Sequence, residues 1–242
     1  MAAIVKLGGS LAAAGTLRRW LDVVVTEGGG RAVIVPGGGD FADGVRAAQK
    51  RWHFSDRTAH RMALLAMQQY ALLLQELAPA LRPCADEAEI AAALAAGSIA
   101  LWLPGPMVEA DPAISESWDV TSDSLAAWLA WRLGATRLVL VKSAPMPEAP
   151  LSPERLAALG FVDAAFPAYV AKAGIAIVYC GPGETARLGE ALRSDRPMVD
   201  SSNPRPHSRE RNPVGGPGSA LAQGRRRGGR SRFLAIRASI GR

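Results

Sequence analysis

Short apolar runs alternate with amphipathic stretches over the first 194 residues of the chain. Strands are predicted where several consecutive residues are apolar, and helices where apolar residues recur at intervals of three and four. The predicted strands are 2–7, 31–35, 99–103, 137–141 and 175–180; the predicted helices are 17–24, 41–50, 56–77, 86–96, 121–133, 184–193 and one that begins at Ser152. Because strands and helices alternate, we expect an α/β fold, a three-layer αβα sandwich around a mainly parallel sheet.

The segment 195–242 differs in composition from the rest of the chain. It carries 11 Arg and 3 acidic residues, which leaves the first 194 residues with a net charge of −2. It is rich in Gly and Pro and has no helix or strand period, which is typical of a disordered segment. We therefore predict one domain, 1–194, followed by a basic tail, 195–242. A shifted reading frame in a GC-rich gene would give the same abrupt change.

Several classes of protein are excluded by what the sequence lacks. The arginines of the tail would attract phosphates, but Phe233 is its only aromatic residue, so we do not expect nucleic-acid binding. Two cysteines cannot form a disulfide scaffold or a C-x-x-C zinc site, and we predict no bound metal in the protein itself. No apolar run is long enough to span a membrane and no signal peptide is recognisable, so we expect a cytoplasmic protein without membrane contact.

Glycine and lysine residues follow the first two predicted strands. Lys6 lies near the end of the first strand and is followed by Gly-Gly-Ser at 8–10, and three glycines, 37–39, follow the second strand. In parallel sheets, ligands bind beyond the carboxyl ends of the strands. Glycine lets backbone N–H groups approach an anion, a helix N-terminus attracts one, and lysine adds a positive charge. This edge is therefore predicted to bind a phosphate or another polar small molecule.

Two further charged residues are predicted at the same edge. Asp123 lies in the first turn of the helix 121–133, for which Thr121 is the predicted N-cap. Lys142 directly follows the strand 137–141. A carboxylate in a first turn also stabilises the helix dipole, which is the structural alternative for Asp123. The functional interpretation is that Asp123 orients the lysines around a phosphoryl group.

With these motifs the sequence resembles the amino acid kinase family, which contains acetylglutamate, aspartate, uridylate and isopentenyl phosphate kinases. The matching segments are Val5–Ser10, Val35–Gly39, Thr121–Ala126 and Leu138–Lys142. The segment Gly37–Leu73 is most similar to a branch from methanogens and methylotrophs. That branch is linked to one-carbon cofactor synthesis and resembles the aminomethylfuran phosphate kinase of methanofuran synthesis.

The resemblance implies ATP-dependent phosphoryl transfer with Mg²⁺, with the acceptor in the N-terminal half of the domain and ATP in the C-terminal half. It assigns catalysis to Lys6, Asp123 and Lys142. It places ATP at Lys6, Gly8, Gly9, Ser10, Lys142, Ser143, Gly181 and Gly183, and the acceptor at Gly37, Gly38, Gly39, Asp40, Arg46, His60, Thr121 and Ser122. In relatives a lysine on a later helix assists transfer, and Lys172 is the nearby candidate.

The residues after the triple glycine indicate which acceptor to expect. Basic side chains gather there, namely Arg46, Arg51, Arg57, His60 and Arg61, against only Asp40, Asp43 and Asp56. Guanidinium groups pair well with phosphate, which favours a small acceptor that is already phosphorylated, and Asp40 or Asp43 would then receive an amine. A solvated face or a dimer contact explains the arginines equally well. A helix histidine beside Arg57, as His60 is, is more often a surface or boundary residue than an acid–base group or a phosphate ligand.

Other interpretations remain open. The protein could bind or store an oxyanion or a nucleotide without transfer, or be a uridylate or amino acid kinase. The segment Gly181–Ala186 also fits the dinucleotide pattern G-x-G-x-x-A, which requires a further strand after the helix 184–193. Trp128 and Trp131 fit a core or a subunit interface, and we expect a homo-oligomer.

Overall fold

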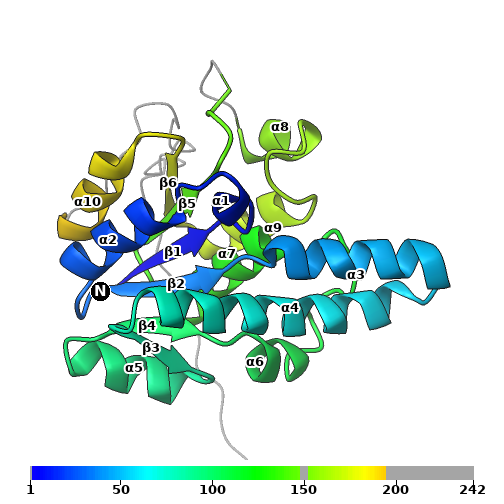
Figure 1. The fold of residues 1–242 in the computed structure, drawn as a ribbon, viewed down its shortest axis with the longest axis horizontal. Coiled ribbons are helices and arrows are strands. Elements are labelled where there is room, and N and C mark those ends of the chain that lie inside the picture. The colour runs from blue at the N-terminus through cyan, green and yellow to red at the C-terminus, as the bar shows by residue number, and fades with distance from the viewer. Residues whose placement is uncertain (1, 148–151, 195–242) are drawn as a thin grey trace, which may run out of the picture. The chain divides into compact units, whose positions relative to one another are not determined.

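The computed structural model describes residues 2–147 and 152–194, and these form a sheet covered by helices on both faces (Figure 1). The strands are β1 (Ala3–Leu7), β2 (Ala32–Pro36), β3 (Leu81–Cys84), β4 (Ile99–Trp102), β5 (Arg137–Val141) and β6 (Ala176–Cys180). They lie in the order β3-β4-β2-β1-β5-β6, and every pairing is parallel. The predicted αβα sandwich is confirmed.

The helices divide between the two faces of the sheet. They are α1 (Ser10–Ala13), α2 (Leu17–Glu27), α3 (Gly39–Trp52), α4 (Asp56–Leu77), α5 (Glu87–Ala95), α6 (Gly105–Glu109), α7 (Ser122–Arg132), α8 (Pro153–Ala158), α9 (Phe166–Ala173) and α10 (Thr185–Arg193). Apolar side chains of α5, α7 and α9 share one core with Ile4 of β1, whereas α2 and α10 share the other with Val5. Successive residues of a strand point to opposite faces of the sheet, so neighbouring residues such as Ile4 and Val5 pack in different cores.

The helices α3 and α4 form a hairpin that extends away from the sheet (Figure 1). Between them lies a small apolar cluster of Ala42, Val45, Ala59 and Ala66. The C-terminal half of α4 packs on the sheet through Tyr70 and Leu74, both buried. The N-terminal half of α4 packs against α3 instead, beside the carboxyl ends of the strands.

Most predicted elements agree with the structure to within two residues, and the exceptions are short. The strand β3 was not predicted because Arg82 and Pro83 interrupt its apolar pattern, which an edge strand tolerates. The helices α1 and α6 are too short to show a period, and the eight-residue helix α9 was not predicted either. The predicted tail lies outside the described residues, as does the further strand that a dinucleotide fold would require. No helix of the described part is both long and apolar enough to cross a membrane; the cytoplasmic location stays a prediction.

Candidate active site

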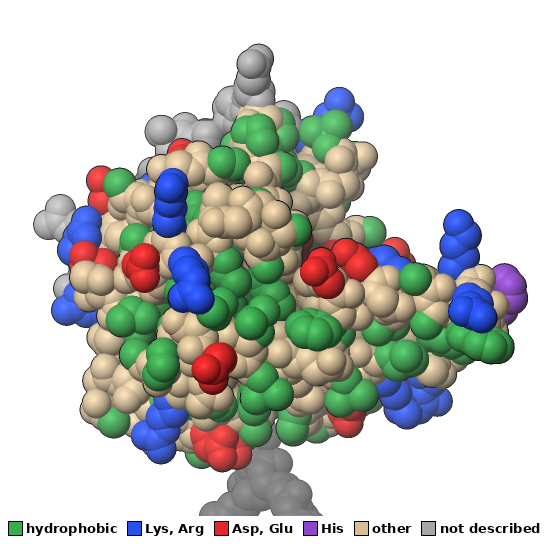
Figure 2. All heavy atoms as spheres, in the orientation of Figure 1, with side chains coloured by type: hydrophobic (Ala, Val, Ile, Leu, Met, Phe, Trp, Pro, Cys, Tyr) green, Lys and Arg blue, Asp and Glu red, His purple; other side chains and the backbone are tan. Residues whose placement is uncertain are grey.

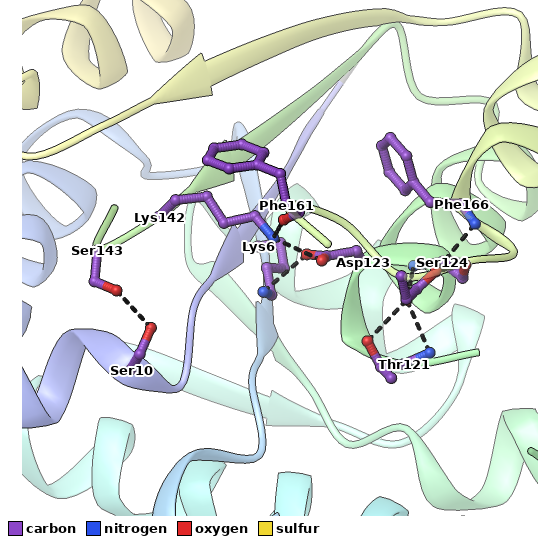
Figure 3. Close-up of polar contacts among 10 residues, drawn as sticks. Lys6, Ser10, Thr121, Asp123, Ser124, Lys142, Ser143, Phe161 and Phe166 are labelled. Carbon is purple, nitrogen blue, oxygen red and sulfur yellow. Dashed lines mark hydrogen bonds and ion pairs between the residues drawn. The ribbon is translucent and has the colours of Figure 1, made fainter. Parts of the chain in front are cut away.

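Two lysines and one aspartate meet at the carboxyl edge of the sheet (Figure 3). The ammonium of Lys6 lies 2.8 Å from Oδ1 of Asp123, and that of Lys142 lies 2.6 Å from Oδ2. Lys142 also donates a hydrogen bond of 2.7 Å to the carbonyl of Phe161. Lys6 and Asp123 are only 6% and 5% exposed. One carboxylate therefore holds two ammonium groups side by side in a site with little water.

The alternation of the strands explains why these three side chains meet. Ile4 of β1 packs in the core that contains α7, so Lys6, two residues further on, points to the same side of the sheet. Leu138 and Leu140 of β5 face α7 in the same way, and Lys142 continues that alternation. Because α7 packs against β1, the first turn of α7 brings Asp123 between the two lysines.

The electrostatics of the site depend on the shared carboxylate. Burial alone would raise the pKa of Asp123, but Lys6 and Lys142 outweigh it and hold that pKa below its ordinary value. Burial, followed by the charge of Lys6, lowers the pKa of Lys142 to about 8. At neutral pH, Asp123 is therefore ionised and Lys142 is still mostly protonated, so the three groups together carry an excess positive charge that suits an anion.

The two glycine loops touch each other through their backbones. A Cβ atom at Gly9 would lie 2.1 Å from the nitrogen of Gly39, and one at Gly37 would lie 2.3 Å from the nitrogen of Gly9. Gly39 also has a positive φ of 52° and lies against the ring of the buried Tyr70. No side chain fits at these positions, so the loops after β1 and β2 form one surface of backbone groups.

Not all of the predicted glycine amides are available to an anion. The N–H of Gly8 donates to the carbonyl of Val141 at 3.1 Å, and that of Gly37 donates to Leu7 at 2.9 Å. The expectation that the Gly8 amide holds a phosphoryl group is therefore wrong, because that amide joins β1 to β5. The first N–H groups of α3, at Gly39 and Asp40, have no partner within a helix. Gly39 lies at the contact between the two glycine loops, so these two N–H groups are suited to donate hydrogen bonds to an anion.

The structure brings together only some of the residues that were predicted to bind ATP. The hydroxyls of Ser10 and Ser143 lie 2.7 Å apart, which joins the loops after β1 and β5 (Figure 3). Gly181 lies against the loop of Ala144 and Pro145, but its N–H donates to the carboxylate of Glu184 at 2.6 Å. An internal carboxylate thus occupies the first amide of the G-x-G-x-x-A segment, which argues against a pyrophosphate there.

A small cavity of about 40 Å³ lies between α3, α4 and the start of α7, where it is lined by Thr121 and Ser122, the two residues that precede Asp123. Its polar lining is Arg46, His60, Thr121 and Ser122, all of which were predicted to bind the acceptor, and Trp118, which was not. The guanidinium of Arg46 lies 4.3 Å from the centre of the Trp118 ring, within the range of a cation–π contact. The structure therefore groups four predicted acceptor residues around one cavity.

His60 is buried, with 4% of its surface exposed, so its interpretation as a surface or boundary residue is wrong. Burial lowers the pKa of His60, and the neutral ring places Nδ1 at 3.4 Å from the carbonyl of Ser117. Since a carbonyl only accepts, the proton belongs on Nδ1 and leaves Nε2 as an acceptor. Nε2 has no hydrogen-bond partner among the described residues. It can receive an N–H or O–H from a ligand.

The remaining arginines of the predicted phosphate cluster are engaged elsewhere. Arg57 and Arg61 both pair with Glu116, at 2.8 and 2.9 Å, and both are exposed. Arg46 pairs with Asp43 at 2.9 Å, so that carboxylate is also occupied. For Arg57 and Arg61 the structure favours the alternative, a solvated face, because both are exposed and share the one carboxylate of Glu116, more than 50 residues away in the sequence.

Lys172 does not join the lysine pair. Its ammonium lies 3.6 Å from the centre of the Trp131 ring, near the C-terminal end of α7. Asp123 is in the first turn of the same helix, about 12 Å away along its axis. The expectation that Lys172 assists transfer is therefore wrong, and Lys142 is the second lysine beside Asp123.

One residue that the sequence did not single out, Asp163, joins two helix starts. Its Oδ2 accepts from the N–H and hydroxyl of Thr121 at 2.8 Å each and from the N–H of Ser124 at 3.0 Å. Its Oδ1 accepts from the Ser124 hydroxyl and from the N–H of Phe166 at 3.0 Å. The predicted N-cap, Thr121, therefore does not cap α7 with its own side chain; the distant Asp163 does.

Comparisons with known proteins agree with this architecture. The [5-(aminomethyl)furan-3-yl]methyl phosphate kinase of Methanocaldococcus jannaschii is 28% identical over 138 residues, which is 57% of this chain and 63% of that protein. The chain thus spans less than two thirds of the length of this curated relative, and the match is to the predicted branch.

Two solved structures share the fold. The uridylate kinase of Archaeoglobus fulgidus superposes with a TM-score of 0.60 at 16% identity, over 80% of this chain and 96% of that one. The UMP kinase of Ureaplasma parvum gives 0.57 at 14% identity, over 81% and 96%. The sequence model of the amino acid kinase family matches residues 1–145. The chain belongs to the amino acid kinase family.

Proposed function

We propose that this protein is an ATP-dependent kinase that transfers the γ-phosphoryl group to a small phosphorylated acceptor. The observation that carries the proposal is the buried arrangement of Lys6, Asp123 and Lys142. Phosphoryl transfer needs little covalent help from a protein, and its catalysis is mainly positioning and neutralisation of charge. Two ammonium groups fixed at one edge of the sheet supply that neutralisation.

Each of the three residues has a distinct role in the proposed reaction. An oxygen of the acceptor attacks the γ-phosphorus while the bond from that phosphorus to the β–γ bridging oxygen breaks, and ADP leaves with the electron pair. Lys6 and Lys142 stabilise the negative charge on the transferring group and the bridging oxygen. Asp123 keeps both ammonium groups in place and does not exchange a proton, since its pKa is held low.

Magnesium fits this scheme only as an ion carried by the nucleotide. The described residues contain no group of three or more His, Cys, Asp or Glu side chains that could hold a metal ion. Both oxygens of Asp123 are already paired with lysines. Phosphate oxygens are common magnesium ligands in kinases, and Mg²⁺ bound there would add positive charge at the same edge.

The acceptor that we propose resembles the substrate named for the M. jannaschii relative: a furan ring with an aminomethyl group and a phosphate. The ring would enter the cavity between α3, α4 and the start of α7, where Nε2 of His60 can accept a hydrogen bond from an amine. A volume of about 40 Å³ holds little more than one water molecule. Arg46 must therefore leave Trp118 when the acceptor binds, and its guanidinium is then available to the acceptor phosphate.

The experiment is a panel of acceptors with ATP and Mg²⁺: aminomethylfuran phosphate, UMP, isopentenyl phosphate, acetylglutamate and aspartate. We expect ADP and a diphosphate product with the furan phosphate. Turnover of UMP alone would support kinase activity but refute the furan phosphate as the acceptor. Turnover confined to the unphosphorylated acids would refute the proposal that the acceptor is phosphorylated. Nucleotide binding without product from any acceptor would favour the alternative, a protein that binds or stores an oxyanion or a nucleotide.

We also propose that the protein is a homo-oligomer. The helix α4 exposes Leu65, Leu72 and Leu73, which lie seven and eight residues apart on one face, and Figure 2 shows hydrophobic side chains along that region. Two copies of this face could pack antiparallel across a two-fold axis. Sedimentation of the wild type and of Leu72→Asp tests this; a monomer in both would refute it.

A further inference from the structure

Asp163 lies between α8 and α9 and accepts five hydrogen bonds with one carboxylate. Four come from Thr121, the N-cap residue of α7, and from Ser124 in the first turn of that helix, and the fifth comes from the start of α9. An ionised carboxylate can accept several such bonds because it has about four lone-pair positions. It also stabilises the positive end of each helix dipole.

The segment that contains Asp163 contacts the second lysine as well. Two residues earlier, the carbonyl of Phe161 accepts the hydrogen bond from Lys142. Val162, between them, is buried and fixes the segment in the core. One side of this segment therefore holds Lys142, and the other side holds the turn that carries Asp123 (Figure 3).

We propose that Asp163 is a positioning residue, which fixes the first turn of α7 so that the carboxylate of Asp123 faces Lys6 and Lys142 together. The expected effect of Asp163 on the reaction rate rests on the proposed kinase function. Its expected effect on the pKa of Lys142 does not depend on activity. Asp163 itself contacts neither lysine and acts through α7 and through its charge.

The charge of Asp163 gives this role a signature that ordinary helix capping lacks. The charged groups that face Lys142 are Lys6 on β1, Asp123 on α7 and Asp163 on the loop before α9. Burial lowers the pKa of Lys142 and so does Lys6, whereas Asp123 and Asp163 raise it. Loss of the Asp163 charge must therefore lower the pKa of Lys142 further, and a looser Asp123 would add to the effect.

The test compares Asp163→Asn with Asp86→Asn in the full chain. Asp86 is a matched control because it caps α5 in the same way, with an oxygen 2.8 Å from the N–H of Glu89, away from the lysine pair. For Asp163→Asn we expect kcat to fall by ~10-fold to 100-fold, as when reacting groups are displaced. The alkaline limb of the rate profile should move to lower pH, whereas Asp86→Asn should show neither change.

A second measurement holds even if no acceptor is turned over. The ammonium of Lys142, assigned in lysine-detected NMR by its absence from Lys142→Met, is titrated in the wild type and in both variants. A lower Lys142 pKa in Asp163→Asn alone supports the proposal, whether or not the kinase proposal survives. An unchanged Lys142 pKa in folded Asp163→Asn, or the same shift in Asp86→Asn, would overturn it.

Discussion

Replacement of Lys142 by methionine should remove a specific pH dependence of stability. In the folded protein, the pKa of Lys142 falls from 10.5 to about 8, because of burial and of the neighbouring Lys6. Each tenfold change in a protonation constant is worth about 1.4 kcal/mol. The buried ammonium therefore costs the fold on the order of 3 kcal/mol at neutral pH, net of its contacts with Asp123 and Phe161.

The sign of the effect follows from proton linkage. Between pH 8 and 10.5 the unfolded chain binds more protons at this lysine than the folded one, so the free energy of unfolding should rise with pH across that window. The full rise is present above 10.5 and is lost as the pH falls through 8. Methionine has a similar shape and does not titrate, so Lys142→Met should lack this rise.

The assay is urea unfolding at several pH values from 7 to 10. We expect the difference between wild type and Lys142→Met to change by about 2 to 3 kcal/mol over this range, whereas Lys50→Met, which removes an exposed lysine of α3, should parallel the wild type. Parallel curves for the wild type and Lys142→Met would show that the burial argument is wrong.

Three further predictions follow from the site. Lys6→Ala should lower kcat by about two to three orders of magnitude, since a donor directed at the transition state is worth roughly 3 kcal/mol; a rate like that of the wild type in a kinase assay would refute its role. Gly9→Ala should destabilise the protein or abolish turnover because its Cβ would lie 2.1 Å from Gly39, whereas Gly44→Ala, with open space around it, should stabilise α3 by about 0.5–1 kcal/mol in urea unfolding. His60→Phe should raise the acceptor KM about tenfold through loss of one hydrogen bond and leave the ATP KM unchanged; an unchanged acceptor KM would remove His60 from the acceptor site.

The sequence was sufficient to predict the parts of the site that depend on strand alternation and on glycine. Lys6 and Lys142 each lie near the end of an apolar run, and their side of the sheet follows from the period of two. The strand β3 was not predicted, because an edge strand tolerates Arg82 and Pro83 and so need not show an apolar pattern.

Contacts made by loop residues were out of reach of such reasoning. Asp163 lies about 40 residues from the helix start that it caps, and neither a period nor a local motif relates the two. Glu116 and Trp118 come from an irregular segment before α7, so their contacts with Arg61 and Arg46 depend on the path of the loop. The arginines near the predicted acceptor site could therefore be counted in the sequence, but which of them are paired with a carboxylate could not be predicted.

The backbone contact between the two glycine loops has a consequence for how a site of this kind could come to bind a different ligand. Gly9 and Gly39 approach without intervening side chains, so the spacing between the loops after β1 and β2 is set by the strands themselves, which pair in register from Ala3 with Ala32 to Leu7 with Pro36. No substitution in either loop can widen or narrow that gap by a small step. New acceptors would instead have to be accommodated at Arg46, His60 and Trp118, where side chains and not the main chain form the wall.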